Sequence, residues 1–130
     1  AIVAEGIPFL GHLGMLPQRV KEEGGYKIKG RRPDERTMLI DDAAALADAG
    51  AFAIVLELVE PTVAAELTST LSIPTIGIGS GPDCDGQILV TTDIWATSPD
   101  YIPKHVQPNE RVKTEMETTI ANWMNNIGKK

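Results

Sequence analysis

The sequence predicts an α/β fold built on a parallel β-sheet. Segments typical of strands alternate with segments typical of helices along the 130 residues, which favours parallel strands joined by right-handed helical connections. Residues 52–59 are almost continuously apolar and rich in β-branched side chains, which predicts a strand covered on both faces. The hydrophobic content of 42% and the charged content of 23% are those of a globular chain, long enough for one modest domain or part of a larger one.

The first half of the chain is expected to contain two strands and one long helix. Residues 1–6 are typical of a helix end, and residues 7–12 of a short strand. Residues 15–32, rich in glycine, predict a short helical turn followed by a long loop. Residues 34–49 carry apolar side chains at helical spacing and lead into the strand at 52–59.

The second half is expected to add a helix, two strands and a final helix. Pro61 suits the first turn of a helix, and residues 73–79 and 87–92 predict the third and fourth strands. Residues 95–107 read as irregular, and Asn109 is a good N-cap for the last helix. The apolar stripe of that helix consists of Val112, Met116, Ile120, Trp123 and Ile127.

Composition and charge exclude several classes of protein. A net charge of −6 argues against a nucleic-acid-binding surface, and the single Cys84 excludes an internal disulfide framework. No apolar run approaches the ~20 residues of a membrane span, and no spacing of acidic residues singles out a metal site. Because the sequence begins at Ala1 rather than at Met, we expect a fragment or a processed chain.

Polar residues fall at or just beyond the carboxyl end of each predicted strand, the edge where α/β proteins build their sites. These residues are His12, Glu57, Ser80 and Asp93. Glu57 is the most informative, because an ionised carboxylate buried without a partner costs several kcal/mol. Its head group either reaches solvent or a Lys or Arg partner, or it serves as a general base, and the strand alone leaves both interpretations open.

Two other motifs carry less weight. Residues 77–81 resemble a phosphate-binding glycine loop but lack its spacing, so a tight turn at a strand end is the better interpretation. Cys84 invites comparison with a Cys–His nucleophile, but Asp83 and Asp85 on either side disfavour a negatively charged thiolate.

A series of motifs, in one order from about residue 7 to residue 104, resembles the ketopantoate hydroxymethyltransferase (3-methyl-2-oxobutanoate hydroxymethyltransferase) family. The motifs are GHLGMLPQ at 11–18, GGYKIKGR at 24–31, GAFAIVLE at 50–57, IPTIGIGSG at 73–81, DGQILV at 85–90 and IPK at 102–104. The resemblance implies a (β/α)8 TIM barrel of the phosphoenolpyruvate mutase/isocitrate lyase type. Residues 1–106 would then form a half barrel containing strands five to eight, and residues 107–130 a C-terminal helix and tail.

The resemblance also implies an activity. Members of the family transfer a hydroxymethyl group from 5,10-methylenetetrahydrofolate to 3-methyl-2-oxobutanoate, giving 2-dehydropantoate for pantothenate synthesis. Mg²⁺ chelates the 2-oxo acid and stabilises its enolate. The complete enzyme is expected to be a homo-oligomer in the cytoplasm, or in mitochondria if the source is eukaryotic, with no nucleic-acid or membrane partner.

By motif, Glu57 falls on the proton acceptor of the family and His12 on a histidine that lines the substrate pocket. The Asp-Ser-Leu-Gly and Lys-Ile-Glu-Gly-Gly motifs, which carry the metal ligands and a substrate-binding Lys on the first four strands, are absent from these 130 residues. We therefore assign no metal ligand here and expect the chain alone to be inactive. The alternatives are a non-catalytic half barrel that packs against a partner, and a lyase or mutase of the same superfamily.

Overall fold

The computed structural model describes residues 1–99 and 101–127. The chain divides into two compact units, Ala1–Ile88 and Leu89–Lys130. The first unit contains the β-sheet, and the second contains the last two helices. The tail at 128–130, which we assigned to the C-terminal part of the chain, lies outside the described residues.

The first unit is built on a four-stranded parallel sheet with the strand order β1-β2-β3-β4. The strands are β1 (Leu10–Gly14), β2 (Ala53–Glu57), β3 (Thr75–Ile78) and β4 (Gly86–Gln87). Gly14 lies beside Glu57 in the register of β1 and β2, and Glu57 lies beside Ile78 in the register of β2 and β3. The predicted α/β fold with a parallel sheet is confirmed.

The helices occupy most of the positions that the sequence predicts. They are η1 (Val3–Glu5), η2 (Pro17–Arg19), α1 (Val20–Glu23), α2 (Pro33–Asp48), α3 (Pro61–Thr70), α4 (Thr91–Ile94) and α5 (Glu110–Asn126). Both α2 and α3 begin with proline, whose fixed φ suits the first helical position. The side chain of Asn109 caps α5 by accepting a hydrogen bond from the backbone N–H of Arg111 at 3.2 Å, as expected.

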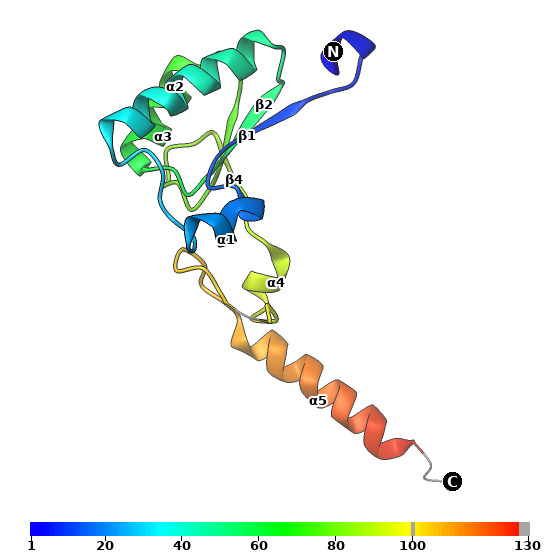
Figure 1. Cartoon of the computed structure of the whole chain (residues 1–130). Coiled ribbons are helices and arrows are strands. Elements are labelled where there is room, and N and C mark those ends of the chain that lie inside the picture. Colours follow the sequence, from blue (N-terminus) through cyan, green and yellow to red (C-terminus); the bar gives the residue numbers. More distant parts are fainter. Residues whose placement is uncertain (100, 128–130) are drawn as a thin grey trace. The chain divides into compact units, whose positions relative to one another are not determined.

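The core lies between the sheet and two helices. Helix α2 packs on β1 and β2, and α3 packs on β3, so both cover the same face of the sheet (Figure 1). Because side chains alternate along a strand, Ile54 and Leu56 of β2 point into this layer. They form one buried cluster with Leu39, Ala43, Val59, Val63, Ala64, Leu67 and Cys84.

The opposite face of the sheet is less covered than the sequence suggests. Val55, Ile76 and Ile78 lie on that face by alternation and register, and all three are only half-buried, while Leu10 is exposed. The apolar run at 52–59 predicted a strand covered on both faces. Among the described residues, α2 and α3 cover one face of this strand, and on the other face Ala53 is buried while Val55 is half-buried, so the second face is partly covered.

The ends of β1 also differ from the prediction. We expected a strand at 7–12 with His12 at its end, whereas β1 begins at Leu10 and continues to Gly14. The pairing with β2 sets these limits, because Leu10 lies beside Ala53 and Gly14 beside Glu57, where β2 begins and ends. His12 is therefore in the middle of the strand, since tertiary pairing overrides the weak strand propensity of the glycines that flank it.

The fourth strand is shorter than predicted, and its expected end is helical. The N–H of Ile88 donates to the carbonyl of Gly77 at 3.0 Å, just after the two residues of β4. The carbonyl of Val90 then accepts from Asp93 at 3.0 Å and from Ile94 at 3.2 Å, which starts α4. Asp93 is thus a helical residue and does not end a strand.

The second unit has little core among its described residues. The expected helix is present as α5, but its apolar stripe is solvent-exposed: Ile120 is 57% exposed and Trp123 67%. Within residues 1–99 and 101–127, no helix combines the length and the apolar character of a membrane span.

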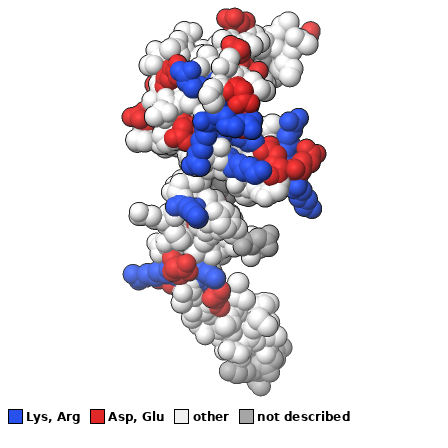
Figure 2. Space-filling view, turned by 60° about the vertical axis from the view of Figure 1, so that its left-hand side comes forward, with Lys and Arg blue, Asp and Glu red and all other residues white. Residues whose placement is uncertain are grey.

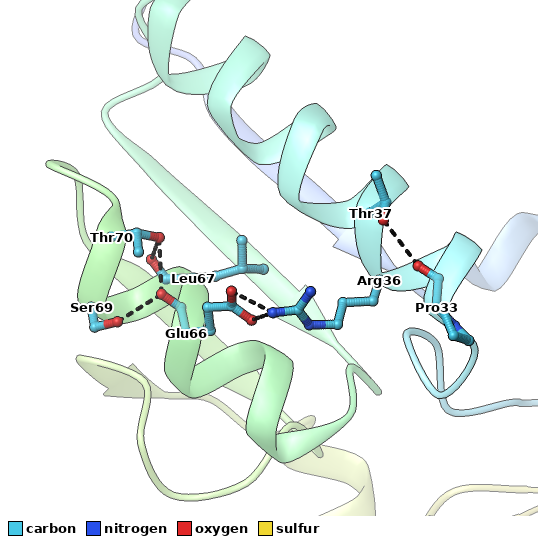
Figure 3. Close-up of polar contacts among 7 residues, drawn as sticks. All are labelled: Pro33, Arg36, Thr37, Glu66, Leu67, Ser69 and Thr70. Atoms are coloured by element: carbon cyan, nitrogen blue, oxygen red, sulfur yellow. Dashed lines mark hydrogen bonds and ion pairs between the residues drawn. The ribbon is translucent and has the colours of Figure 1, made fainter.

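An ion pair joins the two helices that cover the sheet. Nη2 of Arg36 on α2 lies 2.6 and 2.5 Å from the two carboxylate oxygens of Glu66 on α3, as Figure 3 shows. On the same two helices, Thr37 donates to the carbonyl of Pro33, and the hydroxyls of Ser69 and Thr70 donate to the carbonyl of Glu66. Because the pair is partly exposed, it is worth at most about 1 kcal/mol, and the apolar layer beneath it dominates the packing.

We expect the substitution Gly14→Ala to destabilise the sheet more than Gly24→Ala does. Both glycines have positive φ, +99° and +72°, so each alanine carries the cost of a left-handed conformation. A Cβ at Gly14 would also overlap the carbonyl oxygen of Glu57 and lie 2.8 Å from Cγ2 of Val59, whereas a Cβ at Gly24 would meet no atom within 4 Å. Urea unfolding followed by far-UV circular dichroism should show an additional loss of about 1–3 kcal/mol for Gly14→Ala. Equal losses would contradict the close approach of β1 and β2.

Candidate functional site

The two residues that the sequence analysis assigns to the site lie in contact. Glu57 is the last residue of β2, and His12 is the central residue of the neighbouring strand β1. Nε2 of His12 lies 3.1 Å from Oε2 of Glu57. The side chain of His12 is 37% exposed and that of Glu57 is 16% exposed, so the pair is reachable from solvent while the carboxylate is mostly covered.

The parallel register explains this contact. Residues that are partners across parallel strands point to the same face, so His12 shares a face with Val55 and with Glu57 two residues further along β2. This is the face opposite to α2 and α3. With Nε2 protonated, the imidazole donates to the carboxylate and fixes the direction in which Glu57 points. The pair offers one group that can accept a proton and one that orients it.

The backbone around Glu57 is held by neighbouring strands. Its carbonyl accepts a hydrogen bond from the N–H of Met15 at 2.8 Å, and the N–H of Leu58 donates to the carbonyl of Ile78 at 2.9 Å. Leu58 has a φ of +49°, which a leucine rarely adopts. Such a conformation persists only where surrounding contacts enforce it, and here it turns the chain directly after the carboxylate.

Ser80 supplies two of these contacts. Its side chain is 1% exposed; its hydroxyl donates to the carbonyl of Leu56 at 2.7 Å and accepts from the N–H of Val59 at 2.9 Å. These two backbone groups lie on either side of Glu57 and Leu58. Ser80 follows the end of β3, as predicted, and it fixes the backbone of the site.

The remaining candidates do not join the His12–Glu57 pair. Cys84 is buried in the core beneath the sheet, on the face that carries the helices. Asp93 belongs to the second unit, where its carboxylate accepts a short hydrogen bond from the hydroxyl of Ser98. Neither observation gives these residues a role beside Glu57.

Sequence reasoning missed the loop that follows α1. The N–H of Lys29 donates to the carbonyl of Leu58, and the N–H of Glu60 donates to the carbonyl of Lys29, both at 2.8 Å. Lys29 thereby forms an isolated parallel bridge with Val59 just beyond the end of β2. No local pattern predicts this pairing, because the segment is glycine-rich and has no strand periodicity.

The described residues do not form a metal site. Among them, no group of three or more His, Cys, Asp or Glu side chains is placed to hold a metal ion. The residues present therefore do not fit Mg²⁺, and the chemistry below includes no step through a metal.

Comparisons with known proteins identify the family of the chain. A sequence profile described as ketopantoate hydroxymethyltransferase matches residues 1–130. The chain belongs to this family. Proteins named 3-methyl-2-oxobutanoate hydroxymethyltransferase are similar throughout: that of Carboxydothermus hydrogenoformans is 45% identical over 126 residues, which are 97% of this chain and 46% of the relative.

Two further relatives show the same proportions. The protein of Clostridium botulinum is 47% identical over 128 residues, covering 98% of this chain and 46% of the relative. That of Acidothermus cellulolyticus is 52% identical over 113 residues, covering 87% of this chain and 41% of the relative. The chain thus spans less than half the length of the curated relatives that it matches.

We expect Ser80→Ala to lower the free energy of unfolding of this chain by about 1–3 kcal/mol. The substitution leaves the carbonyl of Leu56 and the N–H of Val59 buried without the hydroxyl that bonds to both. Ser69→Ala is the matched control, since its exposed hydroxyl donates only to a carbonyl of its own helix and its loss should cost less than about 0.5 kcal/mol. Urea unfolding followed by circular dichroism compares the two variants. If the Ser80 variant is as stable as the Ser69 variant, the two hydrogen bonds of the Ser80 hydroxyl do not stabilise the backbone around Glu57.

Proposed function

We propose that this chain is the part of a ketopantoate hydroxymethyltransferase that carries the catalytic base. The complete enzyme transfers a hydroxymethyl group from 5,10-methylenetetrahydrofolate to 3-methyl-2-oxobutanoate and forms 2-dehydropantoate. The observation that carries the proposal is the contact between Glu57 and His12 at 3.1 Å, at the edge of the sheet where parallel strands end. Membership of the family supports the choice of reaction.

Glu57 serves as the general base. The proton to be removed lies on C3 of the 2-oxo acid, next to the carbonyl, and its removal gives an enolate. The enolate carbon forms a bond to the one-carbon unit, whose two C–N bonds to the folate break; water supplies the hydroxyl oxygen, and tetrahydrofolate leaves. A base of this kind needs a carboxylate within hydrogen-bonding reach of the substrate and held in one orientation. His12 orients the carboxylate through its hydrogen bond and lines the substrate pocket beside it.

The complete enzyme needs more than these residues. The four parallel strands correspond to strands five to eight of a (β/α)8 barrel, and the half-covered face of the sheet is the inner face of that barrel. Mg²⁺ would be bound by residues of the other half, where the metal-ligand motifs of the family lie. We place the complete enzyme in the cytoplasm as a homo-oligomer.

The two alternative functions have less support. A lyase or mutase of the same superfamily would call for a cysteine in a catalytic loop, whereas Cys84 is buried in the core. A non-catalytic assembly module would explain the half-covered face of the sheet. It would not explain why the register of β1 and β2 brings Glu57 and His12 into contact on that face.

We expect Glu57→Gln in the complete enzyme to lower kcat by about 10²- to 10⁴-fold, because the amide keeps the shape of the side chain and cannot accept the proton. The same substitution at Glu66, whose carboxylate pairs with Arg36 between α2 and α3 (Figure 3), is the control and should leave turnover unchanged. Exchange of deuterium at C3 of 3-methyl-2-oxobutanoate with solvent, measured by NMR without folate, isolates the proton-transfer step. Unchanged exchange and turnover in the Glu57 variant would remove this residue as the base.

We expect the 130-residue chain alone to form no 2-dehydropantoate, since one half of a barrel provides only one wall of the pocket. The assay supplies 5,10-methylenetetrahydrofolate, 3-methyl-2-oxobutanoate and Mg²⁺ and detects the product by mass spectrometry. The full-length relative from Carboxydothermus hydrogenoformans serves as the positive control. Folate-dependent product from the chain alone would show that these residues form a sufficient site.

A further inference from the structure

Basic residues are concentrated in one segment of an acidic chain. The whole chain has 12 Lys and Arg residues and a net charge of −6. Six of these basic residues fall within residues 17–32, a segment that contains only two acidic residues. They are Arg19, Lys21, Lys27, Lys29, Arg31 and Arg32. On the face drawn in Figure 2, several Lys and Arg side chains lie next to one another, with Asp and Glu side chains beside them.

This segment lies at the catalytic edge of the sheet. It follows β1 directly, and its backbone is bonded to the residues that follow Glu57, through the two hydrogen bonds of Lys29 with Leu58 and Glu60. Nε of Arg31 also lies 3.2 Å from Oε2 of Glu60. Hydrogen bonds and an ion pair therefore join this basic segment to the residues that follow Glu57 at the end of β2.

Acidic side chains neutralise only part of this charge. Lys29 pairs with Glu23, Arg31 with Glu60, and Arg32 with Asp34 and Glu35. The other three cations, Arg19, Lys21 and Lys27, have no ion-pair partner within residues 1–99 and 101–127. All three side chains are exposed. We call these three residues the basic rim.

We propose that the basic rim binds the glutamate carboxylates of the folate donor. This inference rests on the proposed function. A reduced folate carries two carboxylates on its first glutamate and one more for each glutamate added, at the end of the molecule remote from the one-carbon unit. When that unit reaches the nucleophilic carbon beside Glu57, the tail extends outward over the edge of the sheet.

The exposure of the rim favours the donor over the second possible source of carboxylate, the 2-oxo acid. The carboxylate of 3-methyl-2-oxobutanoate is two bonds from the carbon that loses the proton, so it must lie deep in the pocket with that carbon. Solvated cations on long side chains suit a flexible polyanion, which contacts several of them in turn, and such attraction weakens as salt is added.

The test uses the full-length enzyme with the variants Lys21→Gln, Lys27→Gln and both together. Lys113→Gln, which removes an exposed lysine of α5, is the control. KM is measured for the donor with one and with five glutamates, and separately for the 2-oxo acid. Each rim variant should raise the KM of the five-glutamate donor by about two- to fivefold, with a smaller effect on the one-glutamate donor and none on the 2-oxo acid.

Equilibrium binding of tetrahydrofolate with one and with five glutamates, measured by titration calorimetry at low and high salt, tests the rim without turnover. The longer tail should bind more tightly to the wild type, and both salt and the double substitution should abolish this preference. Equal binding of both tails to the wild type, or an increased KM for the 2-oxo acid instead, would overturn the inference. If the wild-type enzyme binds the longer tail more tightly but does not transfer a hydroxymethyl group to the 2-oxo acid, the result would count against the proposed function alone.

Discussion

The parallel pairing of β1 with β2 is the constraint on which the site depends. It places Gly14 beside Glu57, and because the glycine has no Cβ, the strands stay close enough for the N–H of Met15 to reach the carbonyl of Glu57 at 2.8 Å. The same register puts His12 on the face of the sheet to which Glu57 points. The contact between imidazole and carboxylate is thus a consequence of backbone geometry, and a shift of one residue would turn His12 to the opposite face.

The conformation of the segment after Glu57 is enforced from the next strand. Leu58 adopts a positive φ, which is unfavourable for a branched side chain. The hydrogen bonds that the N–H groups of Leu58 and Val59 donate to the carbonyl of Ile78 and the hydroxyl of Ser80 compensate for that cost. The turn is what allows the loop at Lys29 to dock beside Val59. Leu58 therefore lies between two features that are distant in sequence. It follows the carboxylate-bearing Glu57 directly, and its carbonyl accepts a hydrogen bond from Lys29 of the positively charged loop.

The sequence predicts the parts of this structure that depend on local pattern. Hydrophobic periodicity and the positions of proline and glycine predict the alternation of strands and helices. They also predict that α2 and α3 begin at proline and that Glu57 lies at a strand end. Features that depend on the pairing of strands are harder to predict from the sequence. Residues 88–90 are as apolar as a strand, yet within the described part of the chain no strand pairs with them beyond the hydrogen bond from Ile88 to Gly77. They stay exposed, so the predicted fourth strand is cut short. The contact of His12 with Glu57 and the docking of Lys29 likewise depend on register, which local sequence does not encode.

The unevenness of the sheet's two faces links the fold to the function. On one face, Leu56 and its neighbours are sealed under two helices, and this layer gives the unit its stability. On the other, Val55 and Ile78 lie on the same face as the His12–Glu57 pair and are only half-buried. In the proposed function, this half-covered face carries the carboxylate that serves as the base, and the substrate reaches it from that side. A chain that spans 46% of the length of a curated relative can supply the proposed base and its backbone support, and under this proposal the remaining walls of the pocket come from the rest of the complete enzyme.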